Sequence, residues 1–442
     1  MQSVEYELPA SAGQRLLWLM NHYRGSAGAF NSHVLLRLRG PLDHDRLTRA
    51  VAELCRRHDA LRTTLRRSGV QLVQTVRQPG DVTVYRKRLD VPIAEAGPVL
   101  AGELAAPLDL TTRPLAVTTF RRSAVDHVLC VKVHHLLTDG WSSAILAREV
   151  CALYQGTHEL PEVPWQFADY VRWQQGQLES HGVLDAHARY WQRQLSGARL
   201  TTLAGLSADP EGTRTTDVTA IEWFELGSTT SQALRELAAQ ERTMLFPMLL
   251  AIFYALLHYL SGDRDIAVAS MFANRTMPQV RGTVGFFANL VVLRREVDPE
   301  DSFRNLLSGT EKTFLGALKH QSLPIQLVPL RTLDGLRLRS PEIMFQLLAG
   351  EQPTSSDMGE LRADRMQTPD GLGSRFDLET IIIPQSGQLK GFLRYNTRRF
   401  SRSWITDFVT AYRTLAARFA EHPDLVVGRG KEVIGELPGV SG

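Results

Sequence analysis

Apolar positions along this chain follow two patterns, one with helical spacing and one with the near-continuous or alternating spacing of strands. Residues 42–57 place Leu47, Val51 and Leu54 on one stripe, which predicts an amphipathic helix. Residues 128–135 are apolar and β-branched almost throughout, which predicts a buried strand. Further helices are expected over residues 11–22 and 142–154 and after Phe246, and further strands over residues 33–38, 70–76, 82–88, 266–270, 287–293 and 380–383.

Helices and strands interleave along the whole chain, which indicates an α/β protein. The 442 residues exceed what one hydrophobic core usually supports. Gly, Ser, Thr, Asp and Pro accumulate over residues 190–220, and we interpret this stretch as a connection between two lobes. We therefore predict an N-terminal lobe over residues 1–178 and a C-terminal lobe over residues 179–442 that includes the connection.

Composition and charge exclude several classes of protein. The 50 basic and 47 acidic residues give a net charge of +3, which offers no reason to expect nucleic acid. The cysteines form no CxxC pair, which argues against a disulfide framework or a zinc site, and Cys130 in its apolar run is expected to be a buried thiol. The most apolar stretch, residues 244–257, is shorter than the roughly 20 residues that span a bilayer. Because the first residues do not resemble a signal peptide, we predict a cytoplasmic protein with no membrane contact.

The sharpest chemical signal is a pair of histidines, His134 and His135, at the end of the apolar run and followed by Leu-Leu-Thr-Asp-Gly. Neighbouring side chains on a strand point to opposite faces, so only one of the two can address a given reaction centre. The same alternation disfavours a metal site, because the two rings cannot easily converge on one ion. Asp139 and Gly140 are expected to form the turn into the next helix, whose positively polarised N-terminus would keep a nearby imidazole neutral. A neutral histidine can accept a proton at physiological pH.

Two interpretations of this segment are open from the residues alone. A lone histidine at a strand end is most often a structural residue, and Asp139 would then only cap a helix. Gly140 either lets a substrate approach the backbone or supplies a conformation that other residues avoid. The complete spacing of the two histidines, Asp139 and Gly140, between a strand and a helix, favours a functional site.

This segment and several others resemble the condensation domains of nonribosomal peptide synthetases. Residues 134–142 match the HHxxxDGWS motif of that family in full. The other similar segments are, in chain order, residues 11–19 (SAGQRLLWL), 57–63 (RHDALRT), 167–174 (FADYVRWQ), 190–191 (YW), 284–289 (VGFFAN), 320–325 (HQSLPI), 374–378 (SRFDL) and 393–397 (LRYNT). Departures are Gly13, Ala288 where valine is usual, and Ser322 in place of an acid. The order and spacing of these segments make the resemblance specific, and it covers nearly the whole chain.

The resemblance implies two lobes similar to chloramphenicol acetyltransferase, arranged as a V-shaped pseudo-dimer around a central tunnel. A carrier protein would present an acyl or aminoacyl thioester on its phosphopantetheine arm at one mouth, and a small or carrier-bound acceptor would enter at the other. His135 would be the catalytic residue, either as a base or by positioning the attacking group. His134, Asp139 and Gly140 would shape the active site, with Asp139 held in a buried ion pair by Arg275. Candidates for the tunnel lining are Ser142, Asn289, Gln346 and Ser374.

These features predict a condensation enzyme that joins a carrier-bound thioester to an amine in natural-product biosynthesis, with no bound cofactor and no metal. Aminolysis of a thioester needs little beyond holding two tethered reactants together and managing one proton. Since the chain begins with Met and shows no carrier-type serine motif and no adenylation domain, we expect a free-standing monomer that serves carrier proteins on other chains, while a domain excised from a larger synthetase would show the same features.

Rival interpretations remain open. An ester-forming or coenzyme A-dependent acyltransferase would share the motif and use an alcohol acceptor. Epimerisation domains also carry it, although Trp141 and Ser142 look more like condensation. A non-catalytic recruitment module is a different class of protein, and the intact His135 and Asp139 disfavour it. Basic clusters within residues 56–67, 86–88 and 398–402 are either solvated faces or docking sites for acidic carrier proteins.

Overall fold

The computed structural model describes residues 4–24, 28–157, 159–180, 183–203, 219–328, 343–348, 355–373 and 375–434. The chain divides into two compact units: the first comprises Met1–Leu184, Ala273–Ala288 and Pro353–Gly373, and the second comprises Asp185–Phe272, Asn289–Gln352 and Ser374–Gly442. The first unit therefore takes in two segments from the second half of the chain. The single boundary after residue 178 that the sequence suggested remains a prediction. Strands and helices alternate in both units, which confirms the predicted α/β class.

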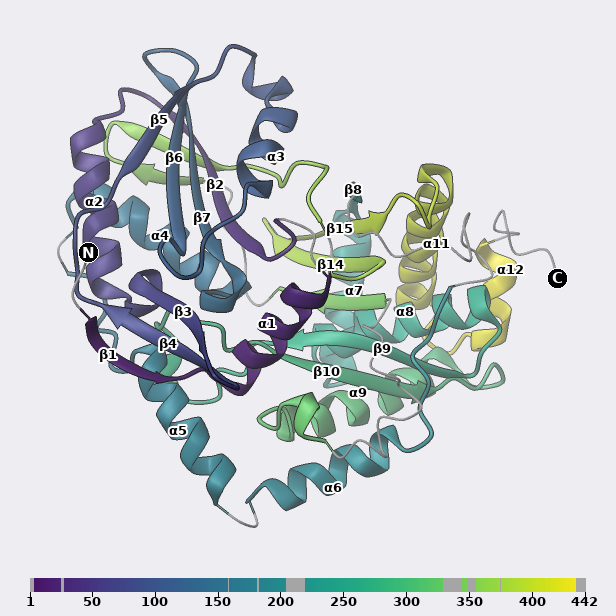
Figure 1. The fold of residues 1–442 in the computed structure, drawn as a ribbon. Coiled ribbons are helices and arrows are strands. Elements are labelled where there is room, and N and C mark those ends of the chain that lie inside the picture. The colour runs from purple at the N-terminus through teal and green to yellow at the C-terminus, as the bar shows by residue number, and fades with distance from the viewer. Residues whose placement is uncertain are drawn as a thin grey trace. The chain divides into compact units, whose positions relative to one another are not determined.

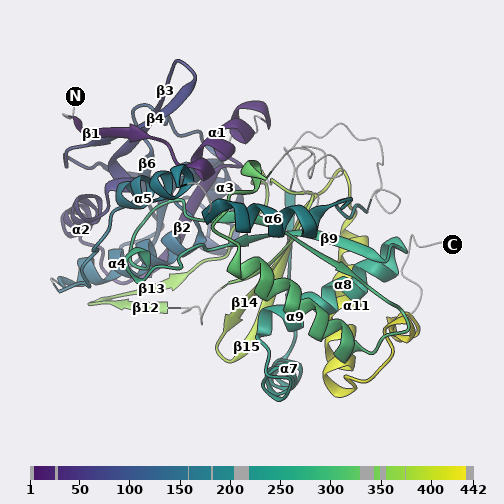
Figure 2. The same cartoon turned by 90° about the horizontal axis from the view of Figure 1, so that it is seen from below.

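The first unit contains a six-stranded sheet, in the order β12-β13-β2-β7-β6-β5, and a three-stranded sheet, in the order β1-β4-β3 (Figure 1). The strands are β1 (Val4–Pro9), β2 (Asn31–Arg39), β3 (Thr63–Ser68), β4 (Gln71–Arg77), β5 (Val84–Arg88), β6 (Leu115–Arg121), β7 (Asp126–His134), β12 (Ser355–Met358) and β13 (Leu361–Arg365). The helices are α1 (Ala12–Arg24), α2 (His44–Arg57), α3 (Gly97–Ala105), α4 (Gly140–Gln155) and α5 (Phe167–Glu179). The hairpin of β12 and β13 comes from the second half of the chain and joins antiparallel to β2 (Figure 2).

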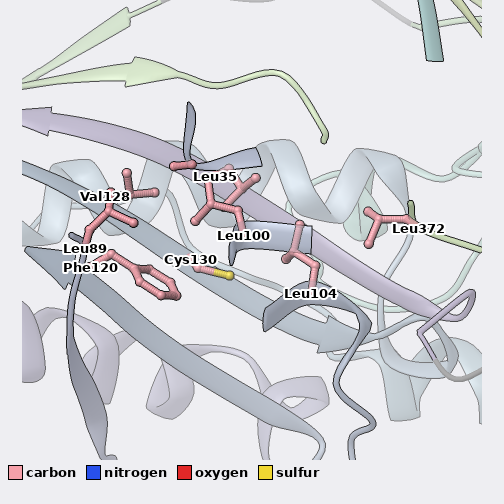
Figure 3. Close-up of a cluster of buried hydrophobic side chains, with 9 residues drawn as sticks. Leu35, Leu89, Leu100, Leu104, Phe120, Val128, Cys130 and Leu372 are labelled. Atoms are coloured by element: carbon pink, nitrogen blue, oxygen red, sulfur yellow. The ribbon is translucent and has the colours of Figure 1, made fainter. Parts of the chain in front are cut away.

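Strand β7 lies in the middle of the larger sheet and leads to the two-histidine motif. It pairs antiparallel with β2 on one side and with β6 on the other, and residues 127–134 are buried. Burial of both faces explains why this strand is a continuous apolar run instead of an alternating one. One face packs in a hydrophobic cluster of Leu35, Leu89, Ala96, Leu100, Leu104, Phe120, Val128, Cys130 and Leu372 (Figure 3). Cys130 is buried as predicted, and burial raises the pKa of its thiol to about 12.

The second unit contains a mixed six-stranded sheet in the order β10-β9-β11-β14-β15-β8. The strands are β8 (Thr219–Glu225), β9 (Asp265–Phe272), β10 (Asn289–Glu296), β11 (Ile343–Leu347), β14 (Leu378–Gln385) and β15 (Gln388–Asn396), and the helices are α6 (Val183–Leu195), α7 (Ser228–Gln240), α8 (Leu245–Ser261), α9 (Phe303–Lys319), α11 (Arg402–Glu421) and α12 (Gly430–Ile434). Helix α8 is apolar almost all round because it is buried among α9, α11 and the sheet. Within the described residues no single helix has the length and hydropathy to cross a membrane, while α7 and α8, bent by 111°, meet the same test only as a pair.

Most elements predicted from periodicity are present, with ends shifted by a few residues. Two predictions need correction. Residues 190–195 belong to α6 and not to an irregular connection, because Trp191 and Leu195 are buried at helical spacing, with 1% and 0% of their surfaces exposed. The strand predicted to include His135 ends at His134.

Candidate active site

The two-histidine motif lies where β7 ends and the chain turns toward α4. His134 is the last residue of β7 and pairs with Asn31 of β2. The residues His135–Leu137 then form a single 3-10 turn. The alternation of side chains along a strand therefore does not decide where His135 points. The hydrogen bonds of each ring have to be considered separately.

His134 is buried, with 4% of its surface exposed. Its Nδ1 accepts a hydrogen bond from the backbone N–H of Leu136 at 3.1 Å, so the proton of the neutral ring is on Nε2. Burial lowers the pKa of His134 to about 4, which keeps the ring neutral at physiological pH. Burial is the cause of this shift, and the influence of the helix terminus on the two rings remains a prediction. His134 thus supports the turn that carries His135.

His135 has the opposite arrangement of donor and acceptor. Its backbone N–H donates to Phe30 O at 2.6 Å, and its Nδ1 lies 2.9 Å from Thr138 O. A carbonyl oxygen only accepts, so Nδ1 carries the proton of the neutral ring and the lone pair is on Nε2. The ring of Phe286 meets the imidazole edge-on, with the two centroids 6.1 Å apart. The neutral tautomer of His135 therefore has a basic Nε2, which is the atom that general-base chemistry needs.

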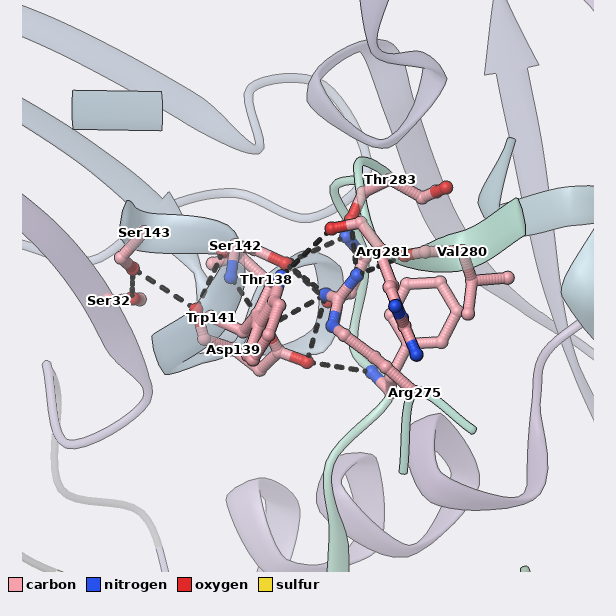
Figure 4. Close-up of polar contacts among 12 residues, drawn as sticks. Ser32, Thr138, Asp139, Trp141, Ser142, Ser143, Arg275, Val280, Arg281 and Thr283 are labelled. Atoms are coloured by element: carbon pink, nitrogen blue, oxygen red, sulfur yellow. Dashed lines mark hydrogen bonds and ion pairs between the residues drawn. The ribbon is translucent and has the colours of Figure 1, made fainter. Parts of the chain in front are cut away.

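Asp139 is the N-cap of α4 and is almost completely buried, with 2% of its surface exposed. Its carboxylate accepts hydrogen bonds from Ser142 N at 2.8 Å, from Phe287 N at 3.1 Å and from the Arg275 guanidinium at 3.1 Å. Figure 4 shows Asp139, Ser142 and Arg275 converging at the start of the helix. The carboxylate therefore joins the first turn of α4 to residues 275–287, a segment that is distant in the sequence.

Arg275 fixes the other side of this network. Its guanidinium also donates to Val280 O at 2.6 Å and to Thr283 O at 2.7 Å, and its central carbon lies 4.1 Å from the centroid of the Phe287 ring. Burial lowers the pKa of Arg275, and the neighbouring Asp139 carboxylate opposes that shift. The predicted buried ion pair is thus present, and it holds residues 275–287 against the start of α4.

Ser142, predicted to line a substrate tunnel, belongs to this buried network instead. None of its surface is exposed. Its hydroxyl accepts hydrogen bonds from Arg275 at 2.8 Å and from Gly285 N at 3.1 Å, and it donates to Gly285 O at 2.9 Å. These bonds use the one donor and both acceptor positions of the hydroxyl, so none remains for a substrate. Its contacts are those of a structural residue.

Gly140 and Gly285 both belong to the matched segments, but the space around the two residues differs. Gly140 is the first residue of α4, does not have a positive φ, and leaves open space where a Cβ would lie. A special backbone conformation therefore does not explain it, and close approach of a substrate remains the prediction. At Gly285, a Cβ would lie 2.3 Å from the Phe167 ring and 2.9 Å from the Phe287 ring. Only glycine fits there, which accounts for its place in the matched segment.

The remaining tunnel candidates are not brought together with His135 by any described contact. Asn289 opens β10 in the second unit, and its Nδ2 donates to Gln321 O and Leu323 O. Gln346 lies on β11 in the second unit, where its Oε1 accepts from Met271 N at 2.9 Å. Ser374 lies outside the described residues. Among the described residues no group of three or more His, Cys, Asp or Glu side chains could hold a metal ion.

Sequence reasoning missed the contacts of four buried polar residues, Gln14, Tyr170, Gln174 and Asn274. Gln14 donates to Leu136 O at 3.0 Å, and both Gln174 and Asn274 donate to the Tyr170 hydroxyl. Three of them lie in segments already singled out for their resemblance to the family, and Asn274 immediately precedes Arg275. That placement was the available signal, but a sequence alone does not show which distant polar residues meet.

The basic clusters are largely occupied by acids of the same chain. Arg57 and His58 both reach the buried Glu149 of α4, at 3.1 and 2.9 Å. Further ion pairs of these clusters among the described residues include Arg56–Glu53, Arg62–Glu5, Arg62–Asp59, Arg66–Glu7, Arg86–Asp45, Lys87–Glu103, Arg88–Asp90, Arg399–Asp377 and Arg402–Glu222. These contacts favour the interpretation of the clusters as structural or solvated faces.

The family model for the condensation domain matches residues 4–431, which is almost the whole chain. The chain belongs to the condensation-domain family. This condensation domain is 32% identical over 438 residues to chondramide synthase of Chondromyces crocatus, covering 95% of this chain and 11% of that protein. It is 30% identical over 441 residues to a linear gramicidin synthase protein of Brevibacillus parabrevis, covering 96% of this chain and 9% of that protein. The condensation domain thus spans about a tenth of the length of these relatives.

Solved structures share the fold of this condensation domain. A four-domain nonribosomal peptide synthetase, holo-AB3403 bound to AMP and glycine, has a TM-score of 0.85 at 18% identity, covering 97% of this chain and 34% of that chain. The SgcC5 protein of Streptomyces globisporus, in complex with a naphthyl ethanediol and sucrose, has a TM-score of 0.80 at 24% identity, covering 95% and 100%. Condensation domains are acyltransferases that form amide or ester bonds, so the predicted enzyme class is confirmed.

Proposed function

We propose that this condensation domain transfers an acyl or aminoacyl group from the phosphopantetheine thioester of a carrier protein to an amine, forming an amide bond in natural-product biosynthesis. The observation that supports this most is the hydrogen bond between His135 Nδ1 and Thr138 O at 2.9 Å. It assigns the lone pair of the neutral ring to Nε2, whereas His134 is buried and has its lone pair on Nδ1. One of the two histidines is thus prepared for proton transfer and the other is structural.

The proposed reaction is the aminolysis of a thioester. The amine first donates a hydrogen bond to His135 Nε2, and this bond aligns the amine. The amine nitrogen then forms a bond to the thioester carbonyl carbon while the amine proton passes to His135 Nε2. The carbon–sulfur bond breaks, and the proton returns from His135 to the departing sulfur, so the arm leaves as a free thiol. No covalent enzyme intermediate is required, because the gain comes from holding both reactants in place and from managing one proton.

The hydrogen bonds around Asp139 support the role of His135 as a base, because they keep the adjoining backbone in a fixed position. Asp139 and Arg275 are both buried, with 2% and 8% of their surfaces exposed. Their hydrogen bonds fix the first turn of α4, which begins only a few residues after His135. A base is efficient only when its nitrogen keeps a fixed distance to the reacting proton. The proposed roles are therefore catalysis for His135 and structural support for His134, Asp139 and Arg275.

An alcohol acceptor is the second candidate. One structurally similar protein, SgcC5, was solved with an ethanediol, and the same Nε2 would accept a hydroxyl proton as readily as an amine proton. The product would then be an ester. The carrier protein, the acceptor and the monomeric state remain part of the proposal in both cases.

The test is a matrix of donors and acceptors. One acyl group is loaded onto a carrier protein and, separately, onto coenzyme A; each donor is offered an amine and an alcohol, and the product is followed by mass spectrometry for wild type and His135→Ala. Amide formed only from the carrier-bound donor, and lost in the variant, supports the proposal. Ester formation in its place assigns the alcohol acceptor. Equal use of coenzyme A points to a general acyltransferase, and binding of carrier protein without product under any pairing points to a recruitment module.

A further inference from the structure

We propose that Tyr170 and Asn274 are positioning residues for His135, acting through a closed circuit of buried hydrogen bonds around the histidine turn. The inference rests on the proposed function, in which His135 moves the proton. All of the contacts that carry it lie within the first unit. The circuit runs from Leu136 through Gln14, Ala12, Gln174, Tyr170, Asn274 and Arg275 to Asp139. Ala12 and Gln14 are joined by the backbone of α1, Asn274 and Arg275 by a peptide bond, and the other links are hydrogen bonds.

The first arm of the circuit holds Leu136, the residue after His135. Gln14 of α1 is completely buried, and its Nε2 donates to Leu136 O at 3.0 Å. Its Oε1 accepts from Ser11 N at 2.8 Å, which fixes the orientation of the amide. The N–H of Leu136 is bound to His134 Nδ1. Both backbone polar groups next to His135 are therefore held.

The second arm meets at the Tyr170 hydroxyl. Gln174 Oε1 accepts from Ala12 N at 3.2 Å, so its Nε2 faces Tyr170 and donates to the phenol oxygen at 3.1 Å. Asn274 Nδ2 donates to the same oxygen at 3.0 Å. These two donors use both acceptor positions of the hydroxyl. Tyr170, with 3% of its surface exposed, is therefore the junction between α5 and the segment that carries Arg275.

Asn274 sets the direction of Arg275. Its φ is 52°, in the left-handed region that few residues other than glycine and asparagine adopt. The hydrogen bond to Tyr170 holds the side chain of Asn274, and the guanidinium of the next residue, Arg275, donates to Asp139. Asp139 lies three residues after Leu136, so the circuit closes around the turn in which His135 Nδ1 meets Thr138 O. The ring of Phe287 packs against the ring of Tyr170, with the two centroids 4.7 Å apart.

The consequence is that loosening Tyr170 should change the tautomer of His135. In Tyr170→Phe both amides lose their acceptor, Asn274 and Arg275 are released from one side, and Asp139 with the adjoining Thr138 can shift relative to His135. Tyr154→Phe is the matched control: Tyr154 is also 3% exposed, accepts one hydrogen bond from Asp43 N at 3.0 Å, and lies at the far end of α4.

The experiment has two readouts. Nitrogen NMR of histidine-labelled protein, with the His135 signals identified from their loss in His135→Ala, is expected to show an Nδ1–H ring in wild type and Tyr154→Phe. In Tyr170→Phe a larger Nε2–H fraction is expected. In turnover, Tyr170→Phe should lower kcat by about tenfold or more with KM within about twofold, because a small displacement of a catalytic group costs rate more than binding. Asn274→Gly should lower kcat similarly, and the double variant should be no worse than either single variant.

Glycine adopts a φ of 52° without strain, so Asn274→Gly carries the test if Tyr170→Phe does not fold. Wild-type tautomer and kcat in both variants would overturn the inference, as would effects of the two substitutions that multiply independently. The NMR readout does not depend on the substrate. A wild type without turnover on any donor, combined with a tautomer change in Tyr170→Phe, rejects the proposed function and supports the positioning circuit.

Discussion

Replacing Asp139 by asparagine tests whether burial or hydrogen-bond geometry makes the network around α4 strong. The carboxylate accepts from Ser142 N through Oδ1, from Phe287 N through Oδ2 and from Arg275 through both. Asparagine has the same shape but only one acceptor oxygen. Whichever way its amide is turned, the NH2 group faces the N–H of Ser142 or of Phe287, and the charge on Arg275 loses its partner.

The expected cost follows from burial. The side chains of Arg275 and Asp139 are 2% and 3% exposed, and removing one partner of such an ion pair costs about 3–5 kcal/mol. Asp126→Asn is the matched control, because Asp126 binds Arg37 with two hydrogen bonds of 2.9 Å, shorter than the 3.1 and 3.3 Å of the buried pair. The Arg37 and Asp126 side chains are 33% and 22% exposed, so about 1 kcal/mol or less is expected there.

The assays are urea unfolding and thermal unfolding, each followed by circular dichroism and tryptophan fluorescence. In urea the midpoints are compared at unchanged slope for the transition that involves the first unit. The melting temperature of Asp139→Asn should fall by on the order of 10 °C, and that of Asp126→Asn by a few degrees at most. If Asp126→Asn is destabilised as much as Asp139→Asn, hydrogen-bond geometry and not burial controls the network, and the reasoning is refuted.

Three further predictions concern single residues of the site. Burial lowers the pKa of His134 from 6.5 to about 4, so the unfolded chain binds more protons between these values, and stability should fall by about 3 kcal/mol as pH drops from 7 to 4. His134→Asn, whose amide oxygen can still accept from Leu136 N, should flatten the dependence of melting temperature on pH; an unchanged dependence would show that another group is responsible. Gly285→Ala should cost about 1–3 kcal/mol because its Cβ would lie 2.3 Å from Phe167, whereas Gly282→Ala, with the nearest atom at 4.0 Å, should melt close to wild type, and equal melting temperatures would contradict the packing argument. Ser142→Ala should cost about 1–3 kcal/mol and leave acyl preference unchanged, because it removes partners of Arg275 and Gly285; a changed acyl preference at full stability would return Ser142 to the tunnel lining.

The parts of the fold that could be predicted are those with a local signal. The buried β7 was visible as a continuous apolar run, and α2 as an amphipathic stripe, because each pattern reports burial within one element. The Asp139–Arg275 pair was expected only because the family resemblance implies an arginine partner for Asp139, and the structure contains this pair.

The parts that could not be predicted depend on contacts between distant segments. The pairing of β13 with β2 joins residues more than 300 positions apart, as Arg362 with Arg39, and the sequence of either strand does not name its partner. Ser142 looked like a lining residue because a serine after the motif is polar, yet its hydroxyl is saturated by Arg275 and Gly285. The tautomers of His134 and His135 depend on single backbone groups, Leu136 N and Thr138 O, that a residue pattern does not reveal.

The most direct test of the central claim is the single-turnover rate of amide formation from a carrier-bound acyl thioester, measured for wild type and for His135→Ala with folding checked by circular dichroism. If His135 Nε2 accepts the amine proton, the rate in the variant should fall by about 10²–10⁴-fold, the usual contribution of general acid–base catalysis. A folded His135→Ala enzyme that forms amide within a few-fold of the wild-type rate would contradict the account, because proton transfer would then not depend on this residue.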